Sequence, residues 1–284
     1  MRKICFIAGL ILLGACNKYD IPGLFVASSP SSDKRFEASV AYNDAEGYPS
    51  VVIPTEDYTF YAATDIHVYH STRNLDKFIA DLSADTGSAP FWINLGDIVD
   101  GKDQMKVFDE HVKAAPQRMF GTPGNHDLYF GQWKQWQELY HTSSYWFEAL
   151  LPSGAKDLYL CLDSAGSTLG HRQRAWAEEV LTAARGEYRH IIVFTHTHFF
   201  RKDWSQETTS NWSQEETMAL TGLFSRCGVS MVLTGHDHFQ ERTTYMGVQY
   251  AVLQSLKDGT PDPGYTRCEV GDQITLTLVP IDIP

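Results

Sequence analysis

The stretch VLTGHDHF (residues 232–239) decides the fold prediction, because it joins an apolar run to three consecutive titratable residues. The apolar residues before Gly235 are typical of a buried strand, and the glycine indicates where that strand ends. If the chain stays extended past the glycine, His236 and His238 project to one side and Asp237 to the other. The pattern predicts that the two histidines act together and leaves Asp237 outside the site.

Strand-like and helix-like segments alternate from residue 57 onward. Apolar runs such as PFWIN and HIIVF predict strands, and amphipathic segments between such runs predict helices. The expected helices cover residues 75–84, 105–115, 172–184 and 215–227. Alternation of this kind is typical of α/β layers. Residues 242–256 and 272–281 contain strand-like runs joined by turns, which predict an antiparallel side to a sheet.

Five of the predicted strands end in polar residues. The side chains at these ends are Asp65, His67, Asp97, Asn125, His196, His236 and His238. Strand ends that face one edge of an α/β sheet converge on a common crevice, where ligands bind. Burying carboxylates and imidazoles together is costly unless a cation holds them. These donors suit manganese, iron or zinc, and seven of them exceed one tetrahedral set, so we expect two ions.

The same strand ends carry a resemblance to a known family. The blocks TDIH, GDIVD, GNHD, a strand-end histidine and GHDH follow one another between residues 64 and 238. This order resembles the pattern of the calcineurin-like metallophosphoesterase superfamily, which is D-x-H, G-D-x-x-D, G-N-H-D/E, histidine and G-H-x-H. The resemblance covers residues 57–284 and implies an α/β fold, a four-layer α/β/β/α sandwich of two mixed sheets flanked by helices.

The resemblance also implies which residues hold each ion. One ion is expected on Asp65, His67, Asp97 and His238. The other is expected on Asp97, Asn125, His196 and His236, so that Asp97 bridges the pair. His126 matches a family histidine that reaches the substrate without binding a metal ion.

Two ions that share a water can lower its pKa and direct the resulting hydroxide at phosphorus, in line with the leaving oxygen. The expected function is therefore hydrolysis of a phosphate mono- or diester by a metal-bridging hydroxide. Asn125 and His126 are the candidate catalytic side chains, because they can stabilise charge on the phosphoryl oxygens. His126 is also expected either to protonate the leaving alkoxide or to hold the phosphoryl group. A metal site that only stabilises the fold is the alternative, but such a site closes its coordination with about four ligands.

Two positions depart from the family pattern. The fourth block is HTH where H-x-P is common, so His198 stands in place of the proline. Alignment favours His196 as the ligand, and His198 is expected either to touch the substrate or to be an ordinary exposed histidine. GDIVD has Asp100 where purple acid phosphatases carry a ligating tyrosine, which argues against a tyrosine-bound ferric iron. We expect Asp100 to accept hydrogen bonds rather than to bind a metal ion.

The polar segment at residues 199–214 follows directly after HTH and is a candidate rim or lid over the site. Its Trp204 and Trp212 are candidate substrate contacts. The aromatic residues expected in the core, in preference to stacking on a substrate, are Trp133, Trp136, Tyr145 and Trp146. Asp163 ends an apolar strand and is expected either to orient a histidine ligand or to cap the following turn.

The N-terminal segment MRKICFIAGLILLGAC has a basic start, a short apolar stretch and small residues at its end. The stretch is too short to span a bilayer comfortably and is typical of a secretory signal. Its ending LGAC resembles the lipobox of bacterial lipoproteins, which implies that residues 1–15 are removed and that Cys16 is lipidated. An ordinary cleaved signal with an incidental cysteine is the alternative.

The expected organisation therefore has three parts. Residues 1–15 form the signal peptide, residues 16–56 contain lipidated Cys16, a linker and an N-terminal decoration, and residues 57–284 form the phosphoesterase domain. Within the second part, FEASVAYN (residues 36–43) is a possible edge strand. The mature protein is expected in the bacterial cell envelope, attached to the membrane only through its lipid.

Loss of residues 1–15 leaves 21 basic and 35 acidic residues, a formal net charge of −14. Such a surface repels phosphate backbones, so strong nucleic-acid binding is not expected and a small phosphate ester is the favoured substrate. Apart from Cys16, the remaining Cys161, Cys227 and Cys268 lack paired spacing and predict no cysteine zinc site. The alternative functions are an envelope pyrophosphatase acting on nucleotide or lipid diphosphates, and a non-catalytic surface lipoprotein that binds a ligand through tryptophans.

Overall fold

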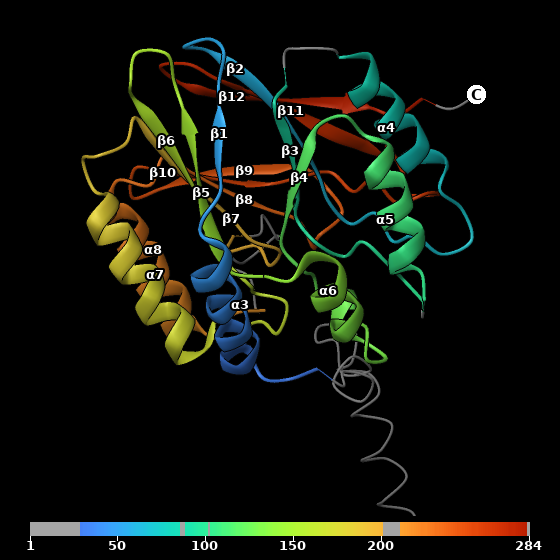
Figure 1. Cartoon of the computed structure of the whole chain (residues 1–284), viewed down its shortest axis with the longest axis horizontal. Coiled ribbons are helices and arrows are strands. Elements are labelled where there is room, and N and C mark those ends of the chain that lie inside the picture. Colours follow the sequence, from blue (N-terminus) through green and yellow to red (C-terminus); the bar gives the residue numbers. More distant parts are fainter. Residues whose placement is uncertain (1–28, 86–88, 102, 201–210, 283–284) are drawn as a thin grey trace, which may run out of the picture.

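The computed structural model describes residues 29–85, 89–101, 103–200 and 211–282. Two mixed β-sheets pack face to face, and helices cover the outer face of each sheet (Figure 1). The expected four-layer α/β/β/α sandwich is therefore confirmed. Within these residues, every helix is too short or too polar to cross a membrane.

The larger sheet has seven strands in the order β1-β5-β6-β7-β8-β10-β9. These strands are β1 (Ser50–Val52), β5 (Tyr145–Leu150), β6 (Lys156–Cys161), β7 (His190–Phe194), β8 (Met231–Thr234), β9 (Glu241–Tyr245) and β10 (Val248–Val252). Strands β6, β7, β8 and β10 run parallel, whereas β5 and β9 pair antiparallel with β6 and β10. The parallel centre places the carboxyl ends of β7 and β8 beside each other.

The smaller sheet has five strands in the order β12-β11-β2-β3-β4. These strands are β2 (Tyr58–Ala63), β3 (Phe91–Asn94), β4 (Arg118–Gly121), β11 (Gly264–Val270) and β12 (Ile274–Pro280). Strands β2, β3 and β4 run parallel, and β11 pairs antiparallel with both β2 and β12. The C-terminal part of the chain thus supplies antiparallel strands to both sheets, as its turn-linked pattern predicts.

Side chains of the central strands divide between an inner and an outer core. In β7, Ile192 and Phe194 point between the sheets, whereas Ile191 and Val193 pack under the outer helices. The strand is buried at every position, and this explains why it is a continuous apolar run in the sequence.

Helices α7 (Gly170–Ala184) and α8 (Gln214–Cys227) cover the larger sheet, and α4 (Arg73–Ala84) and α5 (Met105–Ala114) cover the smaller one (Figure 1). All four match helices expected from the amphipathic pattern, and the short α6 (Trp133–Tyr140) adds a fifth. The ends of α8 show why it begins and stops where it does. The Ser213 side chain accepts a hydrogen bond from the Glu216 N–H, and Gly228 takes the left-handed conformation after the last turn.

The N-terminal part of the described chain differs from expectation. Residues 36–43 lie within helix α3 (Ser32–Glu46), which packs on α7, and do not form an edge strand. The side chains that this helix buries include Arg35, Ser39 and Asn43, at a spacing of about one helical turn. Because this buried face is largely polar, apolar periodicity did not reveal the helix. The edge strand is instead β1, which pairs with β5.

Arg35 joins α3 to the end of β6 through a buried ion pair with Asp163. Its Nε and Nη2 atoms donate to the two carboxylate oxygens at 2.8 and 2.9 Å, and the two side chains are only 2% and 1% exposed. Asp163 also accepts hydrogen bonds from the Ser143 hydroxyl and from the N–H of Ala165. Asp163 therefore caps the turn after β6, which is the second of its two expected roles, and fixes the position of α3.

We predict that Arg35→Ala lowers the free energy of unfolding by about 3–5 kcal/mol, because it leaves the Asp163 carboxylate buried without its cation. The matched control is Arg172→Ala on α7, which removes an exposed ion pair with Glu37 of α3 and should cost no more than about 1 kcal/mol. Urea denaturation followed by circular dichroism measures both. Equal losses for the two variants would contradict the structural role of the Arg35 pair.

Candidate metal centre

The candidate ligands lie in loops that follow five strands, where the two sheets meet. The smaller sheet supplies Asp65 and His67 after β2, Asp97 after β3 and Asn125 after β4. The larger sheet supplies His196 after β7, and His236 and His238 after β8. As the convergence argument predicts, the structure brings all of these side chains together.

The backbone of these loops is not extended. Five of the candidate ligands have φ angles between 49° and 76°, namely Asp65, His67, Asp97, His236 and His238. Left-handed conformations are uncommon for residues other than glycine and cost about 1–2 kcal/mol each. The expectation that His236 and His238 project from a continuing strand is wrong, because β8 ends at Thr234. Tight turns position these side chains instead, and backbone strain of this kind concentrates at functional sites.

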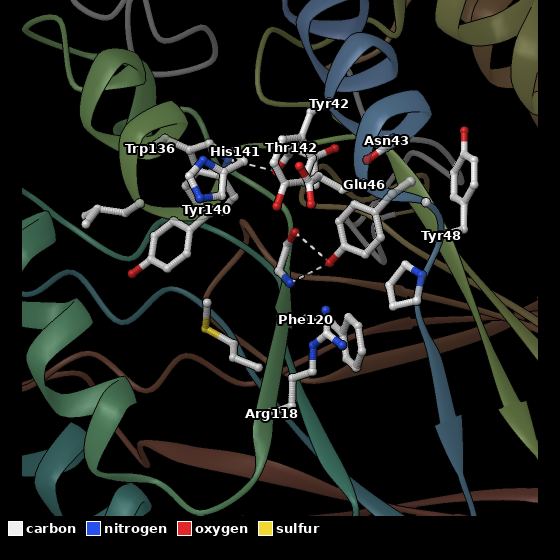
Figure 2. A pocket seen from close by; sticks show the side chains of 16 residues that line it. Tyr42, Asn43, Glu46, Tyr48, Arg118, Phe120, Trp136, Tyr140, His141 and Thr142 are labelled. Carbon is white, nitrogen blue, oxygen red and sulfur yellow. Dashed lines mark hydrogen bonds between the residues drawn. The ribbon is translucent and has the colours of Figure 1, made fainter.

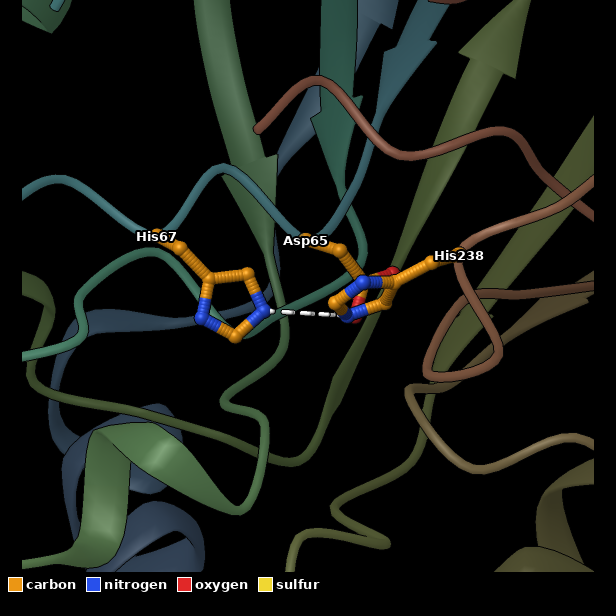
Figure 3. A group of neighbouring side chains, drawn as sticks. All are labelled: Asp65, His67 and His238. Carbon is orange, nitrogen blue, oxygen red and sulfur yellow. Dashed lines mark hydrogen bonds and ion pairs between the residues drawn. The ribbon is translucent and has the colours of Figure 1, made fainter. Parts of the chain in front are cut away.

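The first candidate group consists of Asp65, His67 and His238 (Figure 3), and the Asp97 carboxylate lies near His67. The Nε2 atoms of the two histidines lie 3.1 Å apart, and Asp65 Oδ1 lies 3.3 Å from His238 Nε2. Both Asp65 Oδ1 and Asp97 Oδ2 lie 3.9 Å from His67 Nε2. Ligand atoms about 2.1 Å from one ion are about 3.0–3.4 Å apart in octahedral or tetrahedral coordination. The spacing of this group therefore fits a shared cation with small adjustments.

The second candidate group consists of Asp97, His196 and His236, and the side-chain oxygen of Asn125 lies beside both histidines. Asn125 Oδ1 lies 3.1 Å from His196 Nε2 and 3.0 Å from His236 Nδ1, and these two nitrogen atoms are 3.1 Å apart. Asp97 Oδ2 lies 3.4 Å from His196 Nε2. Burial and the charge on His196 lower the pKa of His236 to about 4, so this ring is in the neutral form that binds metal ions.

Asp97 belongs to both groups. Its Oδ1 accepts a hydrogen bond from the backbone N–H of His126 at 2.8 Å, which leaves Oδ2 directed at both sets of histidines. Burial opposes ionisation of this carboxyl, but the neighbouring His196 and His126 hold its pKa well below the usual range. Asp97 is therefore an ionised carboxylate that lies between the histidines of the two groups.

The remaining carboxylate gives a direct test of whether these residues suit a metal ion. Asp65 is fully buried, and its Oδ2 accepts hydrogen bonds from Thr64 Oγ1 and the His236 N–H, whereas Oδ1 makes no well-directed hydrogen bond within the described residues. Burial raises the pKa of Asp65, but His238 and His196 outweigh this effect and lower it to about 2. A buried anionic oxygen that lacks a well-directed donor is costly, and a cation would satisfy it.

Two glycines allow the loops to approach each other. A Cβ atom on Gly124 would lie 2.1 Å from Asp97 Oδ1, and one on Gly235 would lie 1.9 Å from Thr64 Oγ1 and 2.6 Å from Asp65 Oδ2. Any side chain at either position would push the candidate ligands apart. The glycines of the GNHD and GHDH blocks are therefore required by the packing of the centre.

The second ring nitrogen of two candidate ligands is held by the protein. His67 Nδ1 lies 3.1 Å from Asp100 Oδ1, and His196 Nδ1 lies 2.8 Å from the carbonyl oxygen of Leu95. Such partners fix the ring orientation and the tautomer, so that the opposite nitrogen faces the metal position.

His126 lies beside the two groups and is partly open to solvent. Its Nδ1 is 2.9 Å from Asp100 Oδ1, and its side chain is 32% exposed. Lys257 Nζ donates to the other Asp100 oxygen at 2.9 Å, so the expectation that Asp100 accepts hydrogen bonds is confirmed. Burial lowers the pKa of His126, but Asp97 and Asp100 outweigh this effect and raise it to about 9.

Sequence reasoning did not anticipate the role of Asp127, the last residue of GNHD. Its carboxyl accepts hydrogen bonds from the backbone N–H groups of Ile98 and Gly124, which ties together the loops after β3 and β4. Burial and the nearby Asp97 raise its pKa to about 7. The only hint of this role in the sequence was the position of Asp127 in the GNHD block, next to the candidate site residues.

Tyr129 and Lys257 were also missed. The Tyr129 hydroxyl accepts a hydrogen bond from Asn125 Nδ2 at 2.9 Å, which turns the amide oxygen of Asn125 toward the histidines. Lys257 comes from the loop after β10 and is 157 positions from its partner Asp100. No local pattern in the sequence connects such distant residues.

His198 is buried, so the exposed-histidine alternative is wrong. Its ring stacks on His236 with the ring centroids 5.6 Å apart, and its Nε2 lies 3.5 Å from Asp237 Oδ2. Asp237, which was expected to lie outside the site, is in neither candidate group and instead contacts His198 behind His236.

The remaining expectations have mixed outcomes. Trp212, a candidate substrate contact, is buried, stacks on Phe199 and donates its Nε1–H to the Thr197 carbonyl, so it packs in the core under α8 instead. Trp204 and Cys16 lie outside the described residues, as do residues 201–210 of the candidate lid. Among the aromatic residues expected in the core, Trp133, Trp136 and Tyr145 are buried. Trp146 is half-buried. Cys161, Cys227 and Cys268 are buried free thiols.

A separate cavity of about 510 Å³ lies between α3, β4 and α6 (Figure 2). Aromatic side chains line much of it, including Tyr42 and His141, whose rings stack 4.8 Å apart. Arg118 and Glu46 supply its charged groups. The cavity contains none of the candidate ligands, so it is distinct from the metal centre.

A family model described as calcineurin-like phosphoesterase matches residues 58–240 of the chain. The chain belongs to this family. All of the candidate ligands lie inside the matched residues, and the protein is a metal-dependent phosphoester hydrolase. No curated protein matches the sequence.

Solved structures show that the phosphoesterase shares its fold with distant proteins. A dimetal phosphatase from Danio rerio is 13% identical, with a TM-score of 0.60 over 78% of this chain and 95% of the other. A purple acid phosphatase from yellow lupin is 10% identical, with a TM-score of 0.61 over 79% and 51%. GAP50, described as the anchor in the inner membrane complex of Plasmodium, is 14% identical, with a TM-score of 0.59 over 79% and 84%. These similarities show a shared fold. The chemistry of this chain is inferred from its own candidate centre.

We predict that the purified phosphoesterase contains about two metal ions per chain and that Asp97→Asn reduces this number to below one, because Asp97 Oδ2 faces both groups. His236→Ala and His238→Ala should each lower the metal content, because each removes a ligand from one of the two groups. Asp237→Ala is the matched control and should retain the wild-type content. Elemental analysis after gel filtration measures the content, and full occupancy in Asp97→Asn would contradict the shared position of this carboxylate.

Proposed function

We propose that this calcineurin-like phosphoesterase is a two-metal enzyme that hydrolyses a small phosphate mono- or diester. One observation carries the proposal, namely that Asp97 Oδ2 lies 3.4 Å from His196 Nε2 of one group and 3.9 Å from His67 Nε2 of the other. A carboxylate between two such groups has the position of a bridging ligand in a two-metal site.

The proposed ligands follow from the two groups. One ion would be held by Asp65, His67, Asp97 and His238, and the other by Asp97, Asn125, His196 and His236. This mixture of carboxylate, imidazole and amide oxygen accepts manganese, iron or zinc. Asp100, at the position of the purple acid phosphatase tyrosine, is engaged by His67, His126 and Lys257, which supports a centre without tyrosine-bound ferric iron.

When bound, the two ions would lower the pKa of a shared water and supply the hydroxide that attacks phosphorus in line with the leaving oxygen. Asn125 and His126 would contact the phosphoryl group and stabilise its charge. His126 Nδ1 is occupied by Asp100, so Nε2 is the nitrogen that remains for the substrate. The Asp100 carboxylate at Nδ1 favours the protonated ring, which can donate the proton on Nε2 to the leaving oxygen.

Exposure favours a catalytic centre over a structural one. The His126 and His238 side chains are 32% and 36% exposed, whereas the other side of the centre is buried. A structural metal site is closed by about four protein ligands, and a catalytic site keeps an open position for water or substrate. The open side of this centre is where a phosphate ester would enter.

The sequence supports a proposal about the size of the substrate and the cellular location of the enzyme. The formal net charge of −14 without residues 1–15 favours a small ester over a long nucleic acid. The basic, apolar and LGAC parts of the N-terminal segment support export to a bacterial cell envelope and attachment through lipid on Cys16. We propose that the substrate is met there, outside the cytoplasm.

We predict that metal-loaded protein hydrolyses at least one of p-nitrophenyl phosphate, bis-p-nitrophenyl phosphate and nucleotide diphosphate esters. Asp97→Asn should lower kcat by at least about a hundredfold, because charge stabilisation by the ions is lost. Preference for the diphosphate esters would favour the pyrophosphatase alternative. Absence of turnover with manganese, iron and zinc would contradict the proposed function and favour a protein that only binds its ligand.

We predict that His126→Ala retains its metal ions and lowers kcat by about 10²–10⁴-fold, because a positioned proton donor is lost. The loss should be smaller for p-nitrophenyl phosphate, whose leaving group needs little protonation, than for an alkyl phosphate. His171→Ala, an exposed histidine on α7, is the control and should match wild type. Equal losses for both leaving groups would contradict the proton-donor role.

A further inference from the structure

Two exposed aromatic side chains lie in the loops of the proposed active site. Tyr69 follows His67 by two positions and is 50% exposed, and Phe130 follows His126 by four positions and is 53% exposed. Single exposed apolar residues are ordinary on protein surfaces. Two such rings in loops that carry candidate site residues suggest a role in binding.

Phe130 is also strained. It has a φ angle of 52°, and a left-handed backbone is a true outlier for so bulky a residue. Exposure of its ring means that core packing does not offset the strain. The neighbouring Tyr129 holds the segment in place, because its hydroxyl accepts a hydrogen bond from Asn125 and its ring centroid lies 5.0 Å from that of His126. Strain that folding does not explain is characteristic of ligand-binding positions.

Tyr69 is positioned by its contact with Gly101. A Cβ atom at Gly101 would lie 2.6 Å from the Tyr69 ring, so the ring rests directly on the glycine backbone. Gly101 follows Asp100, whose carboxylate holds His126 Nδ1 at 2.9 Å. Each ring therefore lies next to a partner of His126 or to a residue that flanks one: Tyr69 contacts Gly101, which follows Asp100, and the Phe130 ring centroid lies 6.5 Å from that of Tyr129.

We propose that Tyr69 and Phe130 bind the leaving group of the substrate and that this leaving group carries a flat aromatic ring, as a nucleoside phosphate does. The inference rests on the proposed function, since it is His126 that would protonate the leaving oxygen. A group bound beside His126 extends from that oxygen, and flat rings stack on tyrosine and phenylalanine faces. The excess of acidic residues favours a small ester over a long nucleic acid.

The test compares adenosine 5′-phosphate with ribose 5-phosphate, which share the same reacting ester and differ in the base. Both are assayed with the metal-loaded full-length enzyme, as the phosphates and as their methyl diesters, so that a phosphatase and a diesterase are both covered. Wild type should prefer the adenosine ester by at least about tenfold in kcat/KM. Phe130→Gly and Tyr69→Leu should each reduce this preference by about three- to tenfold, with little change for the ribose ester.

Phe130→Gly is expected to remain folded, because glycine relieves the left-handed strain. Met218→Ala, which removes an exposed side chain on α8, is the control and should keep the wild-type preference. Equal kcat/KM values for the two esters in wild type, or a preference that neither variant changes, would overturn the inference. It would also be overturned if p-nitrophenyl esters were hydrolysed and the adenosine esters were not. If no ester of either set is hydrolysed, the proposed function itself fails.

Discussion

Buried negative charge is the constraint on which the rest of this structure depends. Asp65, Asp97 and Asp127 lie close together in the interior, and none of them is more than 2% exposed. Carboxylates so placed repel one another and lose their hydration, so each needs its own compensation. Histidines keep the first two ionised, whereas burial and Asp97 raise the pKa of Asp127 to about 7 and backbone donors hold it. A bound metal cation would complete this balance.

Periodicity and chain order predicted the α/β class and the convergence of the strand ends, whereas the four-layer arrangement was expected from the family resemblance. The sequence pattern failed at α3, where the helix buries Arg35, Ser39 and Asn43 and so lacks an apolar stripe. It also failed at the three-residue strand β1, which is too short to show any alternation. Contacts between distant residues, such as Lys257 with Asp100, depend on tertiary structure that no local pattern encodes.

The candidate ligands show a different kind of partial success. Their identities were expected from the blocks and the family resemblance, but the reason offered for the spacing of His236 and His238 was wrong. Alternation along a strand requires extended backbone, and these residues have φ angles of 76° and 61°. The turns bring both rings to the centre because Gly235 allows the loop to lie against Thr64. Side-chain types were therefore readable from the sequence, whereas the backbone geometry that positions them was not.

Each candidate group takes ligands from both sheets. The distances between the ligands therefore depend on how the two sheets pack against each other. His238 of the larger sheet meets Asp65 and His67 of the smaller one, and Asn125 of the smaller sheet meets two histidines of the larger. Coordination tolerates only a few tenths of an ångström, whereas the aromatic core between the sheets sets their separation. A change in that core, far from the candidate ligands, would therefore alter the distances between them by changing the separation of the sheets.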